Sequence, residues 1–594
     1  MPWICSVGDT KQLTNPTQSP NRLKNPVEHL EALVKASVGD VPENLQKALA
    51  LQPPKDRSFG DLALPCFPLA KLRGQAPAAI AAEIAESFPV DDIIESANAT
   101  GPFINFRFHR AALAHYVVEG VLTTRAPFGS WNPNGKSIVI DFSSPNIGKP
   151  FHIGHLRSTV IGGALRRIHK HIGSEVHGIN HLGDWGSQFG KIMTAFRRWG
   201  SEEELAARPM QHLFEIYVRY GKDKTEELEA ESAENFRRLE SGEDNAERQL
   251  WQRLRDVSLA AFEGPYKRLN VEFDHVTGES FYEDKMEDAI HRVDKAGILV
   301  ESEGAQVVDF ESKKMPPCIL RKSDGTTIYA TRDLAAIFYR VEQFHFDRAL
   351  YVVGGEQKLH FEQLKAVLSK MSLPEASTVE HIPFGLILSK DPDTEKWGKF
   401  STRAGNAIFL DEVLDEAVNN VRRIIHEKNP DLENADEIAE QVGVSAIVFN
   451  DLKNSRIKDV KFDWGLLLSF EGETGPYVQY AVARLSGILR KAGVDEVVTA
   501  DGVDFALLAD ADQVLLTMLE FGPALQRAAE QNEPSVITNL MIQLAGDIHS
   551  YLRDHNVIRT EGDLRIARIA LVSAARDLLK IGLGLLGVAA PDRM

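Results

Sequence analysis

A strand–helix–strand pattern between residues 137 and 180 constrains the fold more than any other feature. The run SIVIDFS is almost continuously apolar, which is typical of a parallel strand buried on both faces. A helical pattern, GHLRSTVIGGALRRIHKHIG, follows and ends at a glycine, and a second apolar run, EVHGIN, comes next. This order begins a doubly wound α/β fold, so we predict a Rossmann-like nucleotide-binding domain built on a parallel sheet.

The rest of the sequence predicts regions on either side of this domain. Helical spacing and the strand-like FINFRF precede it, and the sheet is expected to resume in AQVVDF, TTIYAT and ALYVVGG. After Asp411 only helical patterns remain. The predicted regions are a disordered tail (1–24), an N-terminal α+β domain (25–130), the Rossmann-like domain (131–412) with a charged helical insertion near 201–255, and a C-terminal all-α bundle (413–594).

Composition limits the class of protein. The 67 Lys and Arg against 85 Asp and Glu give a net charge of −18, which argues against a general basic coating for nucleic acid but allows a local basic track. The three cysteines are far apart, which favours a reducing, cytoplasmic compartment, and no apolar run is long enough for a membrane. The N-terminal composition leaves a mitochondrial form open, although its prolines oppose an amphipathic import helix.

Two histidines, His152 and His155, lie at the predicted strand-to-helix turn. A helix N-terminus offers backbone N–H groups and a favourable dipole to phosphate, Gly154 lets a nucleotide approach, and Lys149 can reach the phosphates. Walker and GxGxxG loops are absent. A helix cap and a zinc site are alternatives, but without HExxH or a nearby cysteine we predict no metal site. The remaining hypothesis is adenylate chemistry with histidines stabilising a pentavalent phosphate.

The sequence resembles a known family at these residues. The segment SSPNIGKPFHIGHLRST contains a HIGH motif, and with the following HLGDWGSQFG it resembles the class I arginyl-tRNA synthetases, particularly the fungal and other eukaryotic type. The resemblance extends through TGES, TTIYATRDLAA and GGEQKLH to the final LLGVAAPDRM. It implies an arginine–tRNA ligase that uses ATP with Mg²⁺ to form arginyl-adenylate and then transfers arginine to the 3′ end of tRNA(Arg). We expect a monomer.

The resemblance also implies a second phosphate-binding loop. The segment GKFSTRAGN matches the KMSKS loop, which in this family grips the pyrophosphate of ATP. Lys399 and Ser401 match the frame of the motif, whereas Arg403 replaces its second lysine. Lys149 stands where a lysine before HIGH compensates for such a change. The expected catalytic residues are therefore His152, His155, Lys149, Lys399 and Arg403, and ATP is expected to contact Gly154 and Ser401 as well.

The arginine pocket can be argued from the shape of the substrate. A guanidinium is planar with five donors, so its pocket should present carboxylates and an aromatic wall. Tyr329 and Asp333 are four apart and share a face if helical, although a helix surface pair is the alternative. The resemblance makes Asp333 the bidentate partner, Tyr329 the wall and Glu279 a second carboxylate. For the α-ammonium group of arginine it implies Ser144, Asn146 and Gln357.

The candidate RNA contacts lie mainly in the C-terminal bundle. Tyr477 and Tyr480 are three apart with Arg484 one turn further, and aromatic side chains beside a basic residue can stack unpaired anticodon bases. A buried aromatic stripe is the alternative. The resemblance favours RNA contact and adds four residues. These are Tyr551 and Met594 in the bundle, and Phe103 and Asn105 in an N-terminal domain that contacts the tRNA elbow.

Two functions of other classes remain open. A tRNA-independent nucleotidylyltransferase would explain HIGH but not the helical bundle. A catalytically silent, synthetase-like RNA-binding protein would require damage in the HIGH or KMSKS region, where only Arg403 departs from the motif. Aminoacylation of tRNA would separate the ligase from both.

Overall fold

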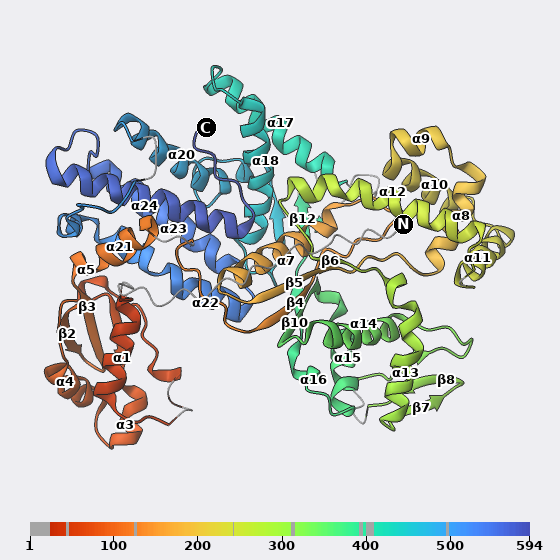
Figure 1. The fold of residues 1–594 in the computed structure, drawn as a ribbon, viewed down its shortest axis with the longest axis horizontal. Helices are drawn as coiled ribbons and strands as arrows, with labels where there is room; N and C mark the ends of the chain where they lie inside the picture. The colour runs from red at the N-terminus through yellow and green to blue at the C-terminus, as the bar shows by residue number, and fades with distance from the viewer. Residues whose placement is uncertain are drawn as a thin grey trace, which may run out of the picture. The chain divides into compact units, whose positions relative to one another are not determined.

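A computed structural model of the chain describes residues 24–42, 45, 47–123, 127–241, 243–310, 315–390, 396–399, 409–494 and 498–594 (Figure 1). The predicted tail therefore lies, apart from Lys24, outside the described residues. The chain forms two compact units. The first contains the described residues up to Thr123 together with 499–516 and 561–571, and the second contains the rest.

The first unit is built on a three-stranded antiparallel sheet with strand order β1-β3-β2. The predicted strand FINFRF is confirmed as β3. Buried Leu30 of α1 and Ile80 of α4 belong to the core of this α+β unit. The elements are α1 (Pro26–Val38), β1 (Leu62–Pro65), α3 (Phe67–Arg73), α4 (Pro77–Ser87), β2 (Ile94–Thr100), β3 (Phe103–Phe108) and α5 (Arg110–Ala114).

The second unit contains a five-stranded parallel sheet with strand order β11-β10-β4-β5-β6. Three of its strands are the predicted runs SIVIDFS, EVHGIN and ALYVVGG, which are confirmed. Central β4 has Ile138, Val139 and Ile140 fully buried, as expected for a parallel strand covered on both faces. The strands are β4 (Ser137–Asp141), β5 (Glu175–Asn180), β6 (His275–Val276), β10 (Arg348–Gly354) and β11 (Val379–Phe384).

Helices cover both faces of this sheet (Figure 1). Helix α7 (Ile153–His171) packs on one face, while α14 (Tyr329–Phe344) and α15 (Lys358–Lys370) form a core with the other. From β4 the chain crosses through α7 to β5, whereas β10 and β11 lie on the opposite side of β4. The carboxyl ends of β4 and β10 therefore form a topological switch point, where open α/β sheets bind ligands.

Two predicted strands of the main sheet are wrong. AQVVDF contributes β8 (Ala305–Val308) to a separate antiparallel sheet with β7 (Leu299–Ser302) and β9 (Cys318–Arg321). TTIYAT instead leads into α14, which begins at Tyr329. Its β-branched residues suggested a strand, but the buried stripe of α14, including Leu334 and Ile337, has helical spacing.

The expectation that β-structure ends at Asp411 is also wrong. Strand β14 (Val460–Phe462) pairs in parallel with β12 (Ile387–Lys390), whose other neighbour is β13 (Trp397–Lys399). Leu386 also donates its N–H to the Asp459 side chain at 2.7 Å. A three-residue strand is too short to show a period in sequence, so the contact with β12 determines its conformation.

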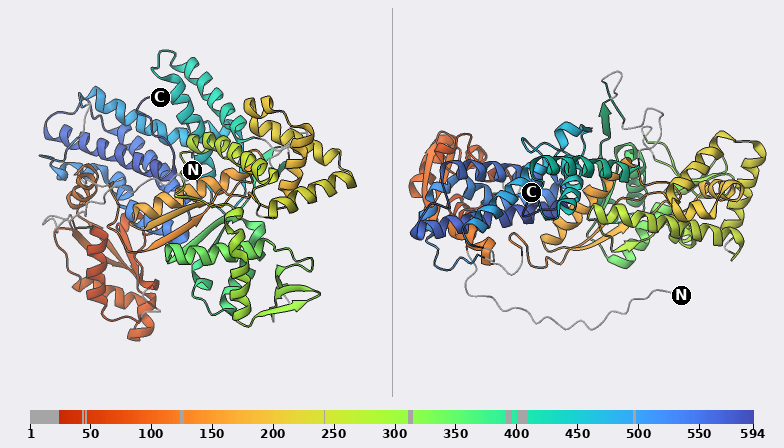
Figure 2. Two further views of the ribbon diagram at one scale, coloured as in Figure 1. Left: turned by 45° about the vertical axis from the view of Figure 1, so that its right-hand side comes forward. Right: turned by 90° about the horizontal axis from the view of Figure 1, so that it is seen from above.

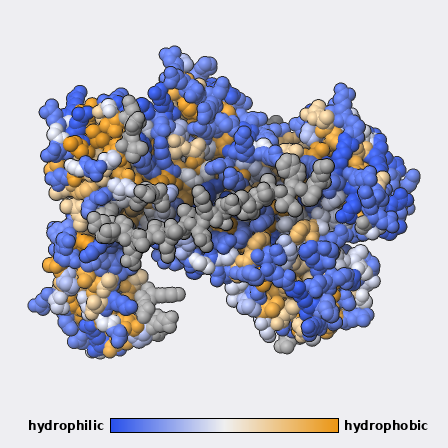
Figure 3. Space-filling model, in the orientation of Figure 1, coloured by the Kyte–Doolittle hydropathy of each residue, from blue (hydrophilic) through white to orange (hydrophobic). Residues whose placement is uncertain are grey.

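The predicted charged insertion is confirmed as helical, and its helices form one group in Figure 2. Figure 3 shows a mainly hydrophilic surface over these helices, as expected for a solvated insertion. They follow α8 (Ser187–Trp199) and are α9 (Glu202–Ala207), α10 (Pro209–Lys222), α11 (Glu226–Glu240) and α12 (Ala246–Arg268).

The C-terminal region after Phe409 is mainly helical, as predicted. Its principal helices are α17 (Leu410–Lys428), α18 (Ala435–Leu452), α20 (Gly475–Lys491), α22 (Phe521–Gln531), α23 (Ser535–Asp554) and α24 (Gly562–Leu586). Within the described residues, none of the helices has the length and apolar character needed to cross a membrane.

Candidate active site

The backbone turns sharply where β4 ends. Ser143 and Ser144 both have positive φ, 74° and 49°, a conformation that costs energy for residues other than glycine. Buried hydrogen bonds hold the turn, because Ser143 N–H donates to Ser158 of α7 at 2.8 Å and the Ser143 hydroxyl contacts Tyr266 at 2.9 Å. The strained turn directs the following loop across the carboxyl end of the sheet.

His152 and His155 begin α7 as a reciprocal pair of caps. The Nδ1 atom of His152 accepts from Gly154 N–H at 3.0 Å, and Nδ1 of His155 accepts from His152 N–H at 3.2 Å. An imidazole that accepts at Nδ1 carries its proton on Nε2 when neutral, so we assign this tautomer to both rings. The helix-cap alternative is therefore observed, with Nδ1 of each ring accepting a backbone hydrogen bond.

The two rings are closely packed and interact electrostatically. Their centroids are 3.9 Å apart. A glycine is required at residue 154, because a Cβ there would lie 2.7 Å from the His152 ring. Burial, followed by the charges of His152 and Lys149, lowers the pKa of His155 to about 3. His155 is consequently neutral near pH 7 and can donate a hydrogen bond without carrying a resident charge.

Lys149 lies half-buried just before this pair. Burial, with a further contribution from Lys191, lowers the pKa of its ammonium group. Among the described residues no carboxylate forms an ion pair with Lys149, and its Nζ lies over the ring of Tyr217, 5.3 Å from the centroid. A half-buried cation without a carboxylate partner is suited to bind an anion.

The predicted KMSKS-like loop is only partly described. Lys399 is the last residue of β13, where its backbone pairs with Leu388. Ser401 and Arg403 lie outside the described residues. Phe409, the first described residue after this gap, forms an isolated β-bridge with His152. This bridge places Phe409 at the start of α7.

Asp333 is engaged by an internal partner that the sequence analysis missed. Its Oδ2 atom lies 2.5 Å from Nε2 of His360, the third residue of α15. Burial pushes the pKa of Asp333 up, but the His360 hydrogen bond and nearby cations outweigh it, and the pKa is lowered. A charged carboxylate is thus held in place before any guanidinium arrives. No periodic signal links Asp333 and His360, which are 27 residues apart.

Glu279 and Tyr329 lie on either side of a cation of the protein itself, Arg332. The guanidinium of Arg332 lies 3.9 Å from Glu279 and over the Tyr329 ring, 5.7 Å from its centroid. Burial raises the pKa of Glu279 to about 7, with Arg332 acting against this rise. Tyr329 is 68% exposed. The predicted wall and second carboxylate therefore already surround one guanidinium.

The remaining predicted arginine contacts follow the carboxyl ends of β4 and β10. The Ser144 hydroxyl donates to Asp141 at 3.1 Å, and Asn146 packs so closely on Gly183 that a Cβ there would be 2.1 Å from its Oδ1. Gln357 is exposed at the end of the short 3-10 helix (Gly355–Gln357) that follows β10, the strand next to β4 in the sheet. The fold thus brings residues from distant segments to one sheet edge.

The candidate RNA contacts differ in exposure. Tyr480 is 45% exposed, whereas Tyr477 is half-buried against His549, with ring centroids 5.4 Å apart. Tyr551 is only 6% exposed, and its ring stacks on His555 at 4.4 Å. Tyr480 is therefore the more accessible ring, although His549 lies 6.1 Å from it between centroids, and Tyr551 is packed as the buried-stripe alternative describes. Arg484, one turn after Tyr480, and the terminal Met594 are half-buried.

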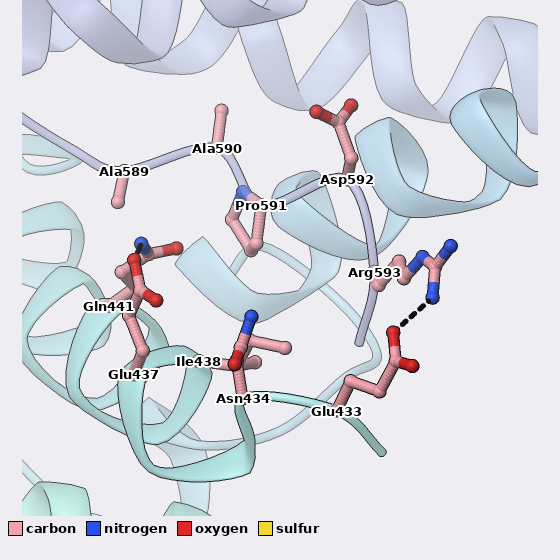
Figure 4. Close-up of a pocket in the computed structure, with 10 residues that line it drawn as sticks. All are labelled: Glu433, Asn434, Glu437, Ile438, Gln441, Ala589, Ala590, Pro591, Asp592 and Arg593. Atoms are coloured by element: carbon pink, nitrogen blue, oxygen red, sulfur yellow. Dashed lines mark hydrogen bonds and ion pairs between the residues drawn. The ribbon is translucent and has the colours of Figure 1, made fainter. Parts of the chain in front are cut away.

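A cavity of about 490 Å³ adjoins the end of the chain (Figure 4). It lies between the start of α18 and residues 589–593, and an ion pair of 3.0 Å between Arg593 and Glu433 spans one side. None of the residues predicted to bind phosphate or arginine lines it. The cavity is therefore distinct from the candidate active site.

The predicted elbow contacts lie on β3 of the first unit. Phe103 is half-buried and packs edge-on against exposed Phe67, with centroids 5.7 Å apart. Asn105 is only 3% exposed, and its side chain donates to Asn98 O at 3.4 Å. Phe103 is therefore the more accessible of the two.

Comparisons with known proteins agree with this architecture. The family described as "tRNA synthetases class I (R), catalytic domain" matches residues 117–464. An "Arginyl tRNA synthetase N terminal domain" matches residues 28–108, and a "DALR anticodon binding domain" matches residues 478–594. These three matches do not fit a nucleotidylyltransferase that lacks an anticodon-binding domain.

Similar proteins match over nearly their whole length. Arginine–tRNA ligases of Exiguobacterium sibiricum and Clostridioides difficile are 44% and 42% identical, each covering 94% of this chain and 98% of the relative. These relatives are bacterial, so the expected fungal or other eukaryotic type is not supported. The Thermus thermophilus arginyl-tRNA synthetase structure has a TM-score of 0.82 at 26% identity, covering 96% of this chain and 100% of that one. By its catalytic-domain match and its full-length relatives, the chain belongs to the class I arginyl-tRNA synthetases.

Proposed function

We propose that the chain attaches arginine to tRNA(Arg) in two steps, at the switch point between β4 and β10. In the first step the arginine carboxylate attacks the α-phosphorus of ATP and pyrophosphate leaves. In the second, a ribose hydroxyl at the 3′ end of tRNA attacks the arginyl carbonyl and AMP leaves. The observation that carries the proposal is the His152–His155 pair, which caps the start of α7 and in which His155 is neutral near pH 7.

The histidine pair would act on the phosphates through hydrogen bonds. With both Nδ1 atoms engaged by the backbone, the Nε2–H donors are fixed in direction before ATP binds. Preorganised donors stabilise charge that develops in a transition state without a cost of reorientation. Lys149 would add positive charge, and Lys399, Ser401 and Arg403 remain proposed contacts of the pyrophosphate.

Mg²⁺ would enter as part of the ATP substrate. The side chains nearest the proposed phosphate site, imidazoles and an ammonium group, are donors rather than the oxygen ligands that Mg²⁺ prefers. We therefore assign the ion to phosphate oxygens, where it would neutralise the leaving pyrophosphate. The chain's own contribution is to position the phosphates and supply hydrogen-bond donors.

The pocket of Asp333, Glu279 and Tyr329 would take the guanidinium of arginine. Asp333 carries the fixed charge, because its pKa is lowered, and Tyr329 offers a ring face. Ser144, Asn146 and Gln357 would receive the α-ammonium group at the neighbouring strand ends. We further propose that the enzyme works in the cytoplasm as a monomer.

Replacing His152 by asparagine tests the phosphate role. Asparagine is itself a strong N-cap residue, so α7 should keep its first hydrogen bonds while losing the Nε2–H donor. We expect kcat for arginine-dependent pyrophosphate exchange, measured with tRNA present, to fall by about 100-fold or more, with the KM for arginine nearly unchanged. Near-normal kcat in the folded variant would show that His152 serves the helix cap alone.

The raised pKa of Glu279 predicts how arginine binding depends on pH. Its pKa is raised to about 7, and only the ionised carboxylate attracts a guanidinium, so binding below that pH requires loss of a proton. The KM for arginine should therefore rise by about tenfold from about pH 8 to about pH 6. Glu279→Gln should flatten this dependence. An equally steep profile in the variant would exclude Glu279 as its source.

Tyr480 is expected to stack on a tRNA base. Loss of one base–aromatic stack costs about 1–3 kcal/mol, so Tyr480→Ala should raise the KM for tRNA by roughly fivefold or more. The KM for arginine should not change. Leu466, a more exposed apolar residue of the second unit at 69%, provides a control through Leu466→Ala. An unchanged KM for tRNA in Tyr480→Ala would show that Tyr480 does not stack on a tRNA base.

A further inference from the structure

Helices next to and within the insertion hold the turn that carries Lys149. Gly148 has a φ of 71°, and its N–H donates to the hydroxyl of Ser258 in α12 at 2.9 Å. A Cβ at Gly148 would lie 2.5 Å from Ile192 Cδ1 in α8, so the backbone turn packs directly on that helix. The position of Lys149 therefore depends on α8 and α12.

Tyr217 of α10 supplies a third contact, and it reaches the ammonium group itself. The Nζ atom of Lys149 lies 5.3 Å from the centroid of the Tyr217 ring, within the range of a cation–π interaction. Both side chains are half-buried. Partial loss of water strengthens such an interaction, because the aromatic face then competes with fewer water molecules for the cation.

The nature of this partner matters for the chemistry. A carboxylate would hold the ammonium group equally well but would neutralise it and occupy its donors. An aromatic face orients the cation and leaves its charge and N–H groups available to an anion. Among the described residues, Lys149 has no ion-pair partner, and Lys191 adds positive charge beside it. The environment of Lys149 therefore suits a polyphosphate.

We propose that Tyr217 is a positioning residue for the activation step, holding the Lys149 ammonium toward the phosphates of ATP through its ring face. The helical insertion thereby acquires a role in catalysis, although it contributes no proposed phosphate ligand of its own. This inference rests on the proposed role of Lys149 in phosphate binding.

The test compares ring-keeping and ring-losing substitutions in the full-length protein. With tRNA and arginine present, Tyr217→Leu should lower kcat/KM for ATP in pyrophosphate exchange by roughly five- to tenfold, and Tyr217→Met should do the same. Tyr217→Phe keeps the aromatic face and should stay within about twofold of the parent. Arg219→Gln is a matched control, because it removes another cation–π contact of α10, the one with Trp199. It should leave kcat/KM for ATP unchanged.

A double-mutant cycle separates this inference from the proposed function. Lys149→Met alone should lower kcat/KM for ATP, and Tyr217→Leu should then add little in the Lys149→Met background. If Lys149→Met has no effect, the phosphate role of Lys149 fails and the inference fails with it. If Lys149→Met acts but Tyr217→Leu does not, or acts equally in both backgrounds, only the inference is overturned.

Discussion

Asp333→Ala is expected to raise the KM for arginine by roughly 30-fold or more, because a desolvated guanidinium that loses its carboxylate partner costs about 2–5 kcal/mol. The same change should remove discrimination against citrulline, which is a neutral analogue of arginine. Asp333 carries a full charge at pH 7, since its pKa is lowered by His360 and nearby cations. The measurement is aminoacylation of tRNA, with the concentration of arginine varied in one series and that of citrulline in another.

Asp333→Asn and His360→Asn provide the comparison. Asp333→Asn keeps the size of the side chain and one acceptor, so the loss of affinity should reflect charge alone. His360→Asn leaves the carboxylate in place without its 2.5 Å partner and should raise the KM for arginine less than Asp333→Ala. If Asp333→Ala folds normally and keeps its KM for arginine, the pocket has been assigned to the wrong carboxylate.

Asp451→Ala is expected to lower the free energy of unfolding by about 3–5 kcal/mol. Asp451 of α18 and Arg157 of α7 form a 2.8 Å ion pair in which both side chains are 2% exposed. Arg157 also donates to Lys458 O at 2.8 Å. Removing the carboxylate would leave a buried guanidinium charge without its counter-ion. Urea unfolding followed by circular dichroism measures the change.

The double variant Arg157→Met/Asp451→Leu shows whether charge is the cause. Apolar side chains of similar volume can replace a buried ion pair with little loss, so the double variant should recover most of the stability lost in Asp451→Ala. If it is as unstable as the single variant, shape and the Lys458 hydrogen bond determine stability here.

Local sequence patterns predicted the parts of the site that are close together in the chain. His152, Gly154 and His155 occupy one helix start, and a strand followed by a helix is enough to place them. Contacts between distant segments could not be found in this way. His360 reaches Asp333 across two helices, and Tyr217 reaches Lys149 from the insertion. Such pairs are produced by the fold and have no period in sequence.

The strand errors have a similar origin. TTIYAT contains β-branched and aromatic residues that fit a strand, but its last residues belong to α14. There the Thr331 hydroxyl donates to the carbonyl oxygen of Leu320 in β9. Strand propensity depends strongly on context, and tertiary contacts override it here. Tyr551 shows the same limit for the site, because only the structure reveals that His555 covers its ring.

The pairing of β14 with β12 has a consequence for dividing the chain. A fragment that stops at the predicted boundary, residue 412, would lack Val460–Phe462 and leave one side of β12 with unpaired N–H and C=O groups. Exposed strand edges of this kind recruit other strands and favour aggregation. A second fragment carrying residues 413–594 would supply the missing strand. The two fragments are therefore expected to be soluble when they are made together, and the first fragment is expected to precipitate when it is made alone.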